Sequence, residues 1–496
     1  MQVSYEEIKS KSQQLTFKNQ AFINGRYVNA ASGKTFACIN PATGQVLTQV
    51  AACDHEDVAR AVKAARQVFE QGTWSQSAPA FRKQVLLDFA QAIEQHQFEL
   101  ALLETMDMGK PISDSSSDVK SAVNLVRWYA EIIDKVYDHV APTPADVLAL
   151  ITREPLGVVA AVTPWNFPLF IACAKIAPAL VTGNSVIIKP AEQSPLTAIF
   201  IAELAAKAGV PDGVLNVLPG FGETAGQALG VHPDVDAISF TGSTEVGKLF
   251  LKYSAESNMK RISLECGGKS PNIVLSDCQS LDEVAQQSVS HVFHNQGQIC
   301  CAPTRLLVAR EIYESLIAKL IQYSQDFQPG DPLNPQSTMG ALVDQTQLQR
   351  VLKYIDIGKT EGAELILGGR QTHLETQGCF IEPTIFSRVN NSMTIAREEI
   401  FGPVLSVLSF DQVDDAVKIA NDTHYGLAAS VWTQNINQAH KVAKALRAGV
   451  VSVNTIDVGD MTTPFGGYKQ SGIGRESSFY GLENYLEVKT TWIKLT

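Results

Sequence analysis

An alternation of short apolar runs and helical patterns begins at Gly157 and limits the folds open to this chain. The runs are rich in β-branched residues, as strands are, and occupy Gly157–Val162, Ser185–Lys189, Leu215–Leu218, Ala237–Phe240 and Arg261–Glu265. The helical patterns between them occupy Leu169–Val181, Pro195–Ala208, Glu223–Leu229 and Glu245–Ser254. This order predicts an α/β fold with a parallel sheet and right-handed crossovers.

The segments that follow these five strands share a composition rich in glycine, proline and polar residues. They read PWNFP, KPAEQ, PGFGE, FTGSTEVG and ECGGKS. Because parallel sheets bind ligands beyond the carboxyl ends of their strands, we expect these segments to form the walls of a cofactor cleft.

The N-terminal part of the chain carries different patterns. Ala21–Val28 reads as a hairpin, because Asn24-Gly25 favours a type I′ turn. Asp54–Gly72 reads as a helix with Asp54 as its N-cap and Gly72 as its end. Further helix is expected over residues 81–109 and 118–137, so the first 130 residues or so are predicted to be mostly helical.

Two further regions complete the plan. A second alternating region, from Ser288 to Tyr425, is long enough for a domain of its own. The C-terminal stretch Glu483–Lys494 reads as a strand separated from the body of the protein. Such strands often pair with a neighbouring subunit, so we expect an oligomer.

Length and charge narrow the class of protein. A chain of 496 residues suggests two or three domains. Its net charge of -11 and pI of about 5.4, without a basic stripe, argue against a nucleic-acid partner. The most apolar stretch, Leu169–Val181, is interrupted by Lys175 and Pro178 and is too short for a bilayer, and the N-terminus lacks the apolar core of a secretory signal. We expect a soluble cytoplasmic protein.

The eight cysteines are scattered, and none has zinc-binding spacing with another cysteine or a histidine. We therefore expect no metal site and reduced thiols, one of which is free to be reactive.

Two glycine-rich loops compete as phosphate sites. The first, Gly220 to Ala225, resembles a dinucleotide fingerprint, although an ordinary strand-to-helix turn explains it equally well. The second, Gly242 to Lys248, resembles a P-loop but continues with Leu249 where a magnesium-binding Ser or Thr is required. It therefore suits a pyrophosphate at a helix N-terminus, with a plain N-cap by Ser243 or Thr244 as the alternative.

Lys189 and Glu192 stand three residues apart, just past a strand end. A carboxylate there accepts hydrogen bonds from both ribose hydroxyls and repels a 2′-phosphate, which favours NAD. The neighbouring lysine leaves NADP open, and a solvated ion pair is the ordinary alternative.

Three side chains form the candidate reactive set. Cys300 follows a polar, glycine-containing stretch, which suits an accessible thiol rather than a buried packing residue. Glu265 ends an apolar strand, where a carboxylate is costly unless it is paired or used, so it is a candidate general base. Asn166 offers an N–H donor in an apolar loop, suited either to an oxyanion or to its own backbone turn.

Taken together, the motifs resemble the aldehyde dehydrogenase superfamily over nearly the whole chain. They are PWNFP (164–168), KPAEQSP (189–195), FTGSTEVG (240–247), LECGGKSPN (264–272), NQGQICC (295–301), EEIFGPV (398–404) and PFGGYKQSG (464–472). The resemblance implies a Rossmann-like parallel-sheet cofactor domain, an α/β catalytic domain and a small oligomerisation β-extension, in a homotetramer or homodimer. The implied domains are residues 1–132 with 156–267 for NAD binding, 268–467 for catalysis, and 133–155 with 480–496 for oligomerisation.

The resemblance also assigns roles by position. It implies that Cys300 is the nucleophile, Glu265 the general base, and Asn166, with the backbone N–H of Cys300, the oxyanion hole. The implied cofactor contacts are Thr163, Trp165, Lys189, Glu192, Gly222, Phe240, Gly242, Ser243, Glu399 and Phe401. The implied substrate contacts are Phe167, Phe170, Ala174, His294, Asp457, Asp460 and Phe465. The reaction implied is oxidation of a small-molecule aldehyde to its acid through a thiohemiacetal and a thioester.

Within the superfamily, RWYAE (127–131), IDKVY (133–137) and GDMT (459–462) resemble the gamma-glutamyl-gamma-aminobutyraldehyde dehydrogenases of putrescine breakdown. Asp457 and Asp460 would favour a cationic substrate tail, unless both are surface loop acids. Ala174 and His294 depart from the family's usual aromatic residues, which widens the tunnel and argues against short-chain aldehydes. Cys266 replaces the commoner Leu, as a packing variant.

Other activities remain open from the sequence. A broad-specificity or betaine-type enzyme fits the same motifs. An acylating enzyme, in which coenzyme A takes the thioester, has little use for Glu265, and a non-catalytic structural protein has little use for Cys300, Glu265 and Asn166 together.

Overall fold

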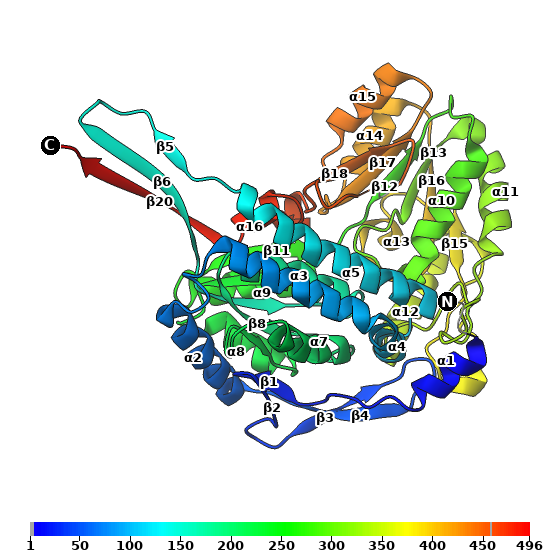
Figure 1. Ribbon diagram of the computed structural model, residues 1–496. Helices are drawn as coiled ribbons and strands as arrows, with labels where there is room; N and C mark the ends of the chain where they lie inside the picture. Colours follow the sequence, from blue (N-terminus) through cyan, green and yellow to red (C-terminus); the bar gives the residue numbers. More distant parts are fainter. Residues whose placement is uncertain (1–3, 457–458) are drawn as a thin grey trace.

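The computed structural model describes residues 4–456 and 459–496 (Figure 1). Within these residues the strands form sheets of eight, seven and three strands and one two-stranded hairpin. The α-helices are α1 (Tyr5–Ser12), α2 (His55–Gln71), α3 (Pro79–Gln95), α4 (Gln97–Met108), α5 (Ile112–Ile132), α6 (Pro168–Val181), α7 (Leu196–Lys207), α8 (Gln227–Val231), α9 (Thr244–Ala255), α10 (Leu281–Phe293), α11 (Tyr313–Ser324), α12 (Gln345–Thr360), α13 (Thr394–Arg397), α14 (Val413–Asn421), α15 (Ile436–Ala445) and α16 (Tyr480–Glu483).

The first sheet has the order β19-β11-β10-β7-β8-β9-β1-β2. Its strands are β1 (Ala21–Ile23), β2 (Arg26–Val28), β7 (Val158–Val162), β8 (Ser185–Lys189), β9 (Leu215–Val217), β10 (Ala237–Gly242), β11 (Arg261–Cys266) and β19 (Gly472–Ile473). The five central strands are parallel, as predicted. After β7 the chain adds β8 and β9 on one side of this strand and then returns to add β10 and β11 on the other side. This reversal at β7 is the kind of switch point where open α/β sheets bind ligands.

Side chains alternate between the two faces of this sheet along each strand, so each face packs in its own core. Val159 and Ala161 of β7 face a core shared with α3 to α7, whereas Val158 and Ala160 face a second core shared with α2 and α8. Because both faces are buried, the strands read as continuous apolar runs, which made them easy to predict.

The second sheet has the order β14-β15-β16-β13-β12-β17-β18 and is parallel except for the β14–β15 pair. Its strands are β12 (Pro271–Val274), β13 (Arg305–Ala309), β14 (Glu364–Leu367), β15 (Thr384–Ser387), β16 (Val404–Phe410), β17 (Ala428–Trp432) and β18 (Val450–Val453). The predicted bounds Ser288–Tyr425 are too narrow, because β12 precedes them and β17 and β18 follow them. The four-residue β12 comes so soon after β11 that no helical pattern separates the two sheets in the sequence.

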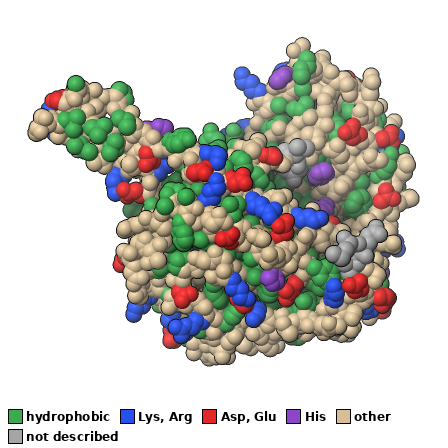
Figure 2. Space-filling view, viewed as in Figure 1, with side chains coloured by type: hydrophobic (Ala, Val, Ile, Leu, Met, Phe, Trp, Pro, Cys, Tyr) green, Lys and Arg blue, Asp and Glu red, His purple; other side chains and the backbone are tan. Residues whose placement is uncertain are grey.

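The third sheet projects from the body of the molecule (Figure 1). It consists of β5 (His139–Ala141), β6 (Val147–Pro155) and β20 (Leu486–Lys494). The C-terminal strand is confirmed, and along its length it pairs with β6 of its own chain, as an edge strand of this sheet. Exposed apolar side chains gather on this projection (Figure 2), among them Val140, Val488 and Trp492.

Near the N-terminus the Asn24-Gly25 hairpin is confirmed, since both turn residues have positive φ. A second hairpin, β3 (Thr35–Ile39) with β4 (Val46–Ala51), lies in the part predicted to be mostly helical. The helix expected over residues 81–109 is two helices that meet at His96, and α5 begins at Ile112 rather than at residue 118. Among the described residues, no helix has the length and apolarity needed to cross a membrane.

The predicted start and end of α2 are confirmed. The side chain of Asp54 accepts a hydrogen bond from the N–H of Glu56, and the side chain of Asp57 accepts one from the N–H of Asp54, which completes a capping box. Gly72 ends the helix in the left-handed region, with φ of 77°.

Asp54→Ala removes this cap and leaves first-turn N–H groups of α2 without a partner. We expect a loss of about 1 kcal/mol of local stability. Hydrogen exchange of the first-turn amides should become about fivefold faster, since this is what 1 kcal/mol amounts to in an opening equilibrium. The exposed Asp88→Ala on α3 serves as the control, and unchanged exchange in Asp54→Ala would show that the cap does not hold the turn.

Candidate active site

Cys300 lies in a loop of unusual backbone conformation between α10 and β13. Asn295, Gln296 and Gly297 have successive φ values of 48°, 56° and 71°, all in the left-handed region. Two non-glycine residues in this region carry strain, so surrounding contacts must hold the loop in place. The loop leaves Cys300 partly exposed, while Cys301 beside it is buried.

Asn166 supplies those contacts from the loop after β7. Its Nδ2 donates to the carbonyl of Gln298 at 2.8 Å, and its own carbonyl accepts from Nδ2 of Asn295 at 3.0 Å. Asn166 is 3% exposed, so these bonds are shielded from water. An amide nitrogen carries two N–H groups, and one of them orients the cysteine loop. The second N–H is not used in this bond and remains able to donate to another acceptor.

Glu265 lies near the carboxyl end of β11 and is 4% exposed. Its Oε1 has no hydrogen-bond partner among the described residues. Burial raises the pKa of Glu265 well above its ordinary value, and the neighbouring Cys300 and Glu476 raise it further. Gly268 allows this proximity, because a Cβ there would lie 2.7 Å from the carbonyl oxygen of Cys300.

A buried ion pair lies beside Glu265. Lys175 of α6 is fully buried, with its Nζ 2.5 Å from Oε1 of Glu476 and 3.2 Å from Oγ of Ser239. The charge of Lys175 lowers the pKa of Glu265 and that of Glu476 raises it, so the pair partly cancels at the carboxyl group.

The adenosine side of the predicted cleft lies at the ends of β7 and β8. The N–H of Thr163 donates to the carbonyl of Lys189 at 3.1 Å, and the carbonyl of Trp165 accepts from Oγ of Ser194 at 3.0 Å. Nζ of the buried Lys189 lies 3.1 Å from Oε2 of the half-buried Glu192. Burial lowers the pKa of Lys189, which Glu192 partly offsets. A partly exposed carboxylate held in this way is a suitable acceptor for ribose hydroxyls.

The two glycine-rich loops have different structures. A Cβ at Gly222 would have no atom within 4 Å, so the backbone there faces open space. Ser243 is the N-cap of α9, and its Oγ accepts from the N–H of Val246 at 3.3 Å. Both the alternative N-cap and an anion site at this helix N-terminus are compatible with that geometry. The ring of the buried Phe240 packs against Gly242, so these two shape the loop.

Glu399 and Phe401 face this cleft from the second sheet. Oε1 of Glu399 accepts from the N–H of Gly268 at 3.1 Å, and a Cβ at Gly267 would lie 1.9 Å from Oε2, so a larger residue there would displace the carboxylate. Burial raises the pKa of Glu399 to about 7. The ring of Phe401 meets that of Trp165 edge to face at 5.1 Å, which joins the two walls.

Sequence reasoning missed two residues that hold this second wall. Nη2 of Arg350 donates to the carbonyl of Glu399 at 2.9 Å, and Nε2 of Gln347 donates to the carbonyl of Phe401 at 2.6 Å. Both stand on α12, about fifty residues away, and no local pattern marks them. Only the tertiary packing of α12 against the EEIFGPV segment brings them there.

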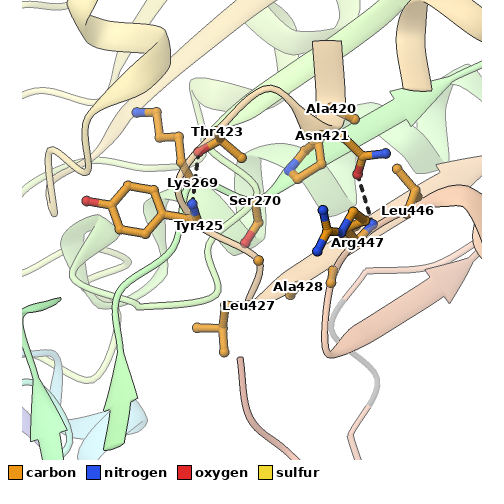
Figure 3. A pocket seen from close by; sticks show the side chains of 14 residues that line it. Lys269, Ser270, Ala420, Asn421, Thr423, Tyr425, Leu427, Ala428, Leu446 and Arg447 are labelled. Atoms are coloured by element: carbon orange, nitrogen blue, oxygen red, sulfur yellow. Dashed lines mark hydrogen bonds between the residues drawn. The ribbon is translucent and has the colours of Figure 1, made fainter. Parts of the chain in front are cut away.

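A further missed residue is Lys269, which follows Gly268. It is fully buried, its Nζ has no hydrogen-bond partner among the described residues, and burial lowers its pKa to about 7. Lys269 borders a hollow of about 10 Å³ together with Tyr425 and Arg447 (Figure 3). That volume suits about one water molecule, so this hollow is too small to hold a coenzyme.

A larger cavity lies near the segments that carry Asn166 and Cys300. It has a volume of about 360 Å³ and is lined by Phe167, Ser290, His291, His294, Ile299, Ala302 and Pro303. Phe167 directly follows Asn166, and Ile299 directly precedes Cys300, but Asn166 and Cys300 are not themselves among the lining residues. Two of the predicted substrate residues, Phe167 and His294, line the cavity.

The other predicted substrate residues lie elsewhere. Ala174 is buried in the core around α6, and Phe170 packs against the same core. Phe465 packs in a small cluster with Cys300 and Leu427. The carboxylate of Asp460 is exposed and accepts from the N–H of Thr462 at 2.8 Å, and Asp457 lies outside the described residues.

Comparison with known proteins identifies the family. The aldehyde dehydrogenase family model matches residues 27–491. The NADP/NAD-dependent aldehyde dehydrogenase PuuC of Escherichia coli (strain K12) is 51% identical over 488 residues, 98% of each chain. A crystal structure of a gamma-glutamyl-gamma-aminobutyraldehyde dehydrogenase from Burkholderia cenocepacia J2315 is 52% identical, with a TM-score of 0.98 and full coverage of both chains.

A crystal structure of an indole-3-acetaldehyde dehydrogenase in complex with NAD+ is 55% identical, with a TM-score of 0.99 over 99% of this chain and all of the other. The resemblance inferred from the motifs is thus confirmed, and the chain belongs to the aldehyde dehydrogenase family.

Proposed function

We propose that this enzyme oxidises an omega-amino or gamma-glutamylated aminoaldehyde to its carboxylic acid with NAD(P)+, in the breakdown of polyamines such as putrescine. The observation that carries the proposal is the convergence of Cys300, Glu265 and Asn166 on one edge of the first sheet. The substrate class is supported by PuuC and by the gamma-glutamyl-gamma-aminobutyraldehyde dehydrogenase structure, each about half identical to this chain. The likeness to an indole-3-acetaldehyde dehydrogenase keeps a broader or betaine-type specificity as the second candidate.

The first step is attack by Cys300. The thiolate sulfur bonds to the aldehyde carbon, and the carbonyl electron pair moves to oxygen to give a thiohemiacetal oxyanion. In this mechanism the second N–H of Asn166 and the backbone N–H of Cys300 donate to this oxygen. In a site shielded from water, such fixed donors stabilise developing charge strongly.

The coenzyme supplies a hydride acceptor at this point. The residues that would hold it are the Lys189–Glu192 pair and the Thr163–Trp165 backbone at the adenosine end, the open backbone at Gly222 with Ser243 and the Gly242 loop at the phosphates, and Glu399 with Phe401 at the nicotinamide end. The open space at Gly222 and the partly exposed Glu192 carboxylate fit a dinucleotide.

Glu265 acts as the general base in the hydrolysis of the thioester. Its carboxylate removes a proton from water, the water oxygen bonds to the acyl carbon, and the carbon–sulfur bond breaks to release the acid and the thiolate. A base in this position distinguishes a hydrolytic enzyme from an acylating one, in which coenzyme A displaces the cysteine.

We also propose that residues 1–132 with 156–267 act as the NAD-binding domain, 268–467 as the catalytic domain, and 133–155 with 480–496 as the oligomerisation segment. The exposed apolar side chains of the projecting sheet support assembly into a homodimer or homotetramer. A cytoplasmic location completes the proposal.

Cys300→Ala should abolish turnover while leaving NAD+ affinity within about twofold, because the thiol lies far from the adenosine end of the cleft. Steady-state NADH formation and titration of coenzyme binding measure the two effects. Activity close to that of the wild type would rule out a covalent mechanism at Cys300, and Cys266→Ala provides a matched thiol control.

Glu265→Gln should keep a rapid burst of about one NADH per active site and slow steady-state release by about 10²-fold or more, since it removes the base for hydrolysis. Because the pKa of Glu265 is raised, the base form is lost as pH falls through that raised pKa. Wild-type steady-state rate should therefore rise with pH and the variant's should not. Equal loss of burst and steady state would contradict this role.

Glu192→Gln should weaken NAD+ binding and raise the ratio of kcat/KM for NADP+ to that for NAD+ by about tenfold. The reason is that it removes the carboxylate that repels a 2′-phosphate. The ratio of kcat/KM for the two coenzymes measures this. An unchanged ratio would show that Glu192 does not contact the ribose; Glu203→Gln, which changes a half-buried carboxylate on α7 that is paired with Lys207, is the control.

A further inference from the structure

The helix that follows Asn166 has no cap of its own. α6 begins with Pro168, which has no N–H, and Phe167 at the N-cap position has no side-chain acceptor. The first N–H of the helix is therefore that of the fully buried Leu169, three residues after Asn166. A buried N–H without a partner is costly, so another part of the fold must supply an acceptor.

Glu104 of α4 supplies that acceptor. Its Oε2 accepts from the N–H of Leu169 at 3.3 Å, while its Oε1 lies 3.0 Å from Nζ of Lys110. The side chains of Glu104 and Lys110 are both fully buried. A carboxylate at a helix N-terminus also interacts favourably with the helix dipole. α4 thus caps α6 across a separation of 65 residues in the chain.

Lys110 adds a second contact at the same place. Its Nζ lies 2.5 Å from Oδ2 of Asp118 on α5 and 4.2 Å from the ring centroid of Phe167, whose face attracts a cation. Burial raises the pKa of Glu104 to about 7, and the charge of Lys110 limits that rise. The buried pair therefore holds both the ring of Phe167 and the first turn of α6, directly after Asn166.

The direction in which Asn166 donates depends on its backbone. Its Nδ2 already donates one N–H to the carbonyl of Gln298, which leaves one direction for the other. A donor to an oxyanion is effective only within hydrogen-bond distance of the developing charge, and a displacement of about 1 Å can cost about 10²-fold in rate. On one side of Asn166 the N–H of Thr163 donates to the carbonyl of Lys189, and on the other side lies the contact of Glu104.

We propose that Glu104 is a positioning residue of the reaction, which caps α6 and thereby fixes the direction in which Asn166 donates to the oxyanion. Lys110 assists by holding Glu104 and the ring of Phe167. This inference rests on the proposed role of Asn166 in the oxyanion hole. In this role Glu104 contacts neither substrate nor coenzyme, and its effect reaches the reaction only through Asn166.

The test is a double-mutant cycle with Glu104→Ala and Asn166→Ala, alone and together. The rate constant of NADH formation in a single turnover is measured at saturating NAD+. Asn166→Ala should lower it by about 10²-fold and Glu104→Ala by about tenfold. The double variant should lie within twofold of Asn166→Ala, because both changes act through one group. The losses should be equal for 3-aminopropionaldehyde and butyraldehyde, since both form the same oxyanion.

Two further variants serve as controls. Glu104→Gln keeps an oxygen atom that accepts from the N–H of Leu169, and it should restore the rate constant to within about threefold of the wild type. Asn435→Ala removes the cap of α15, where the Asn435 side chain accepts from two backbone N–H groups, and it should leave the rate constant unchanged. NAD+ affinity should stay within twofold in every variant.

The outcomes separate the two roles. If Asn166→Ala leaves the rate constant within twofold, the proposed oxyanion role of Asn166 is wrong, and that of Glu104 with it. If Asn166→Ala slows the reaction but Glu104→Ala has no effect alone, or adds its full loss to that of Asn166→Ala, the role of Asn166 stands and that of Glu104 is overturned. If Glu104→Ala does not fold, Glu104→Asp, whose side chain is one methylene shorter, takes its place in the cycle with the same readings.

Discussion

The reciprocal hydrogen bonds between Asn166 and the cysteine loop are the contact on which the site depends. The strained loop around Asn295 and Gln296 is held by Asn166, which donates to Gln298 and accepts from Asn295, and by further hydrogen bonds of the Gln298 side chain to Asn295 and Val343. The same bonds join a loop of the first sheet to the segment that leads into the second. One asparagine therefore ties the strained loop that precedes Cys300 to the first sheet.

Several ionisable groups that water would otherwise solvate are buried around this contact. Burial desolvates Glu265, Glu399 and Lys269. It raises the pKa of the two carboxyl groups and lowers the pKa of the lysine, and each shift favours the uncharged form. Such shifts lower the stability of the folded protein, and groups with shifts of this kind are common in active sites. The Lys175–Glu476 pair shows the opposite arrangement, since two opposite charges buried together largely compensate each other.

The cavity wall adds a third electrostatic environment. Lys110 pairs with Asp118 and Glu104 deep in the structure, whereas Asp114 lies against His294 and Ser113 and the charge of Lys110 acts on it from farther away. Two carboxylates one helical turn apart on α5 thus differ in their surroundings.

The sequence alone determined the parallel sheet, because strands buried on both faces are continuous apolar runs, and it determined the caps of α2 and the turn at Asn24-Gly25, because these depend on local backbone chemistry. It also marked Cys300, Glu265 and Asn166, whose residue types are unusual for their places in the pattern. The tertiary structure alone decided that β20 pairs with β6, that β12 belongs to the second sheet, and that α12 holds Glu399 and Phe401. It also brought Asp114 to His294 across 180 positions, since contacts between distant segments follow from packing and leave no periodic trace in the chain.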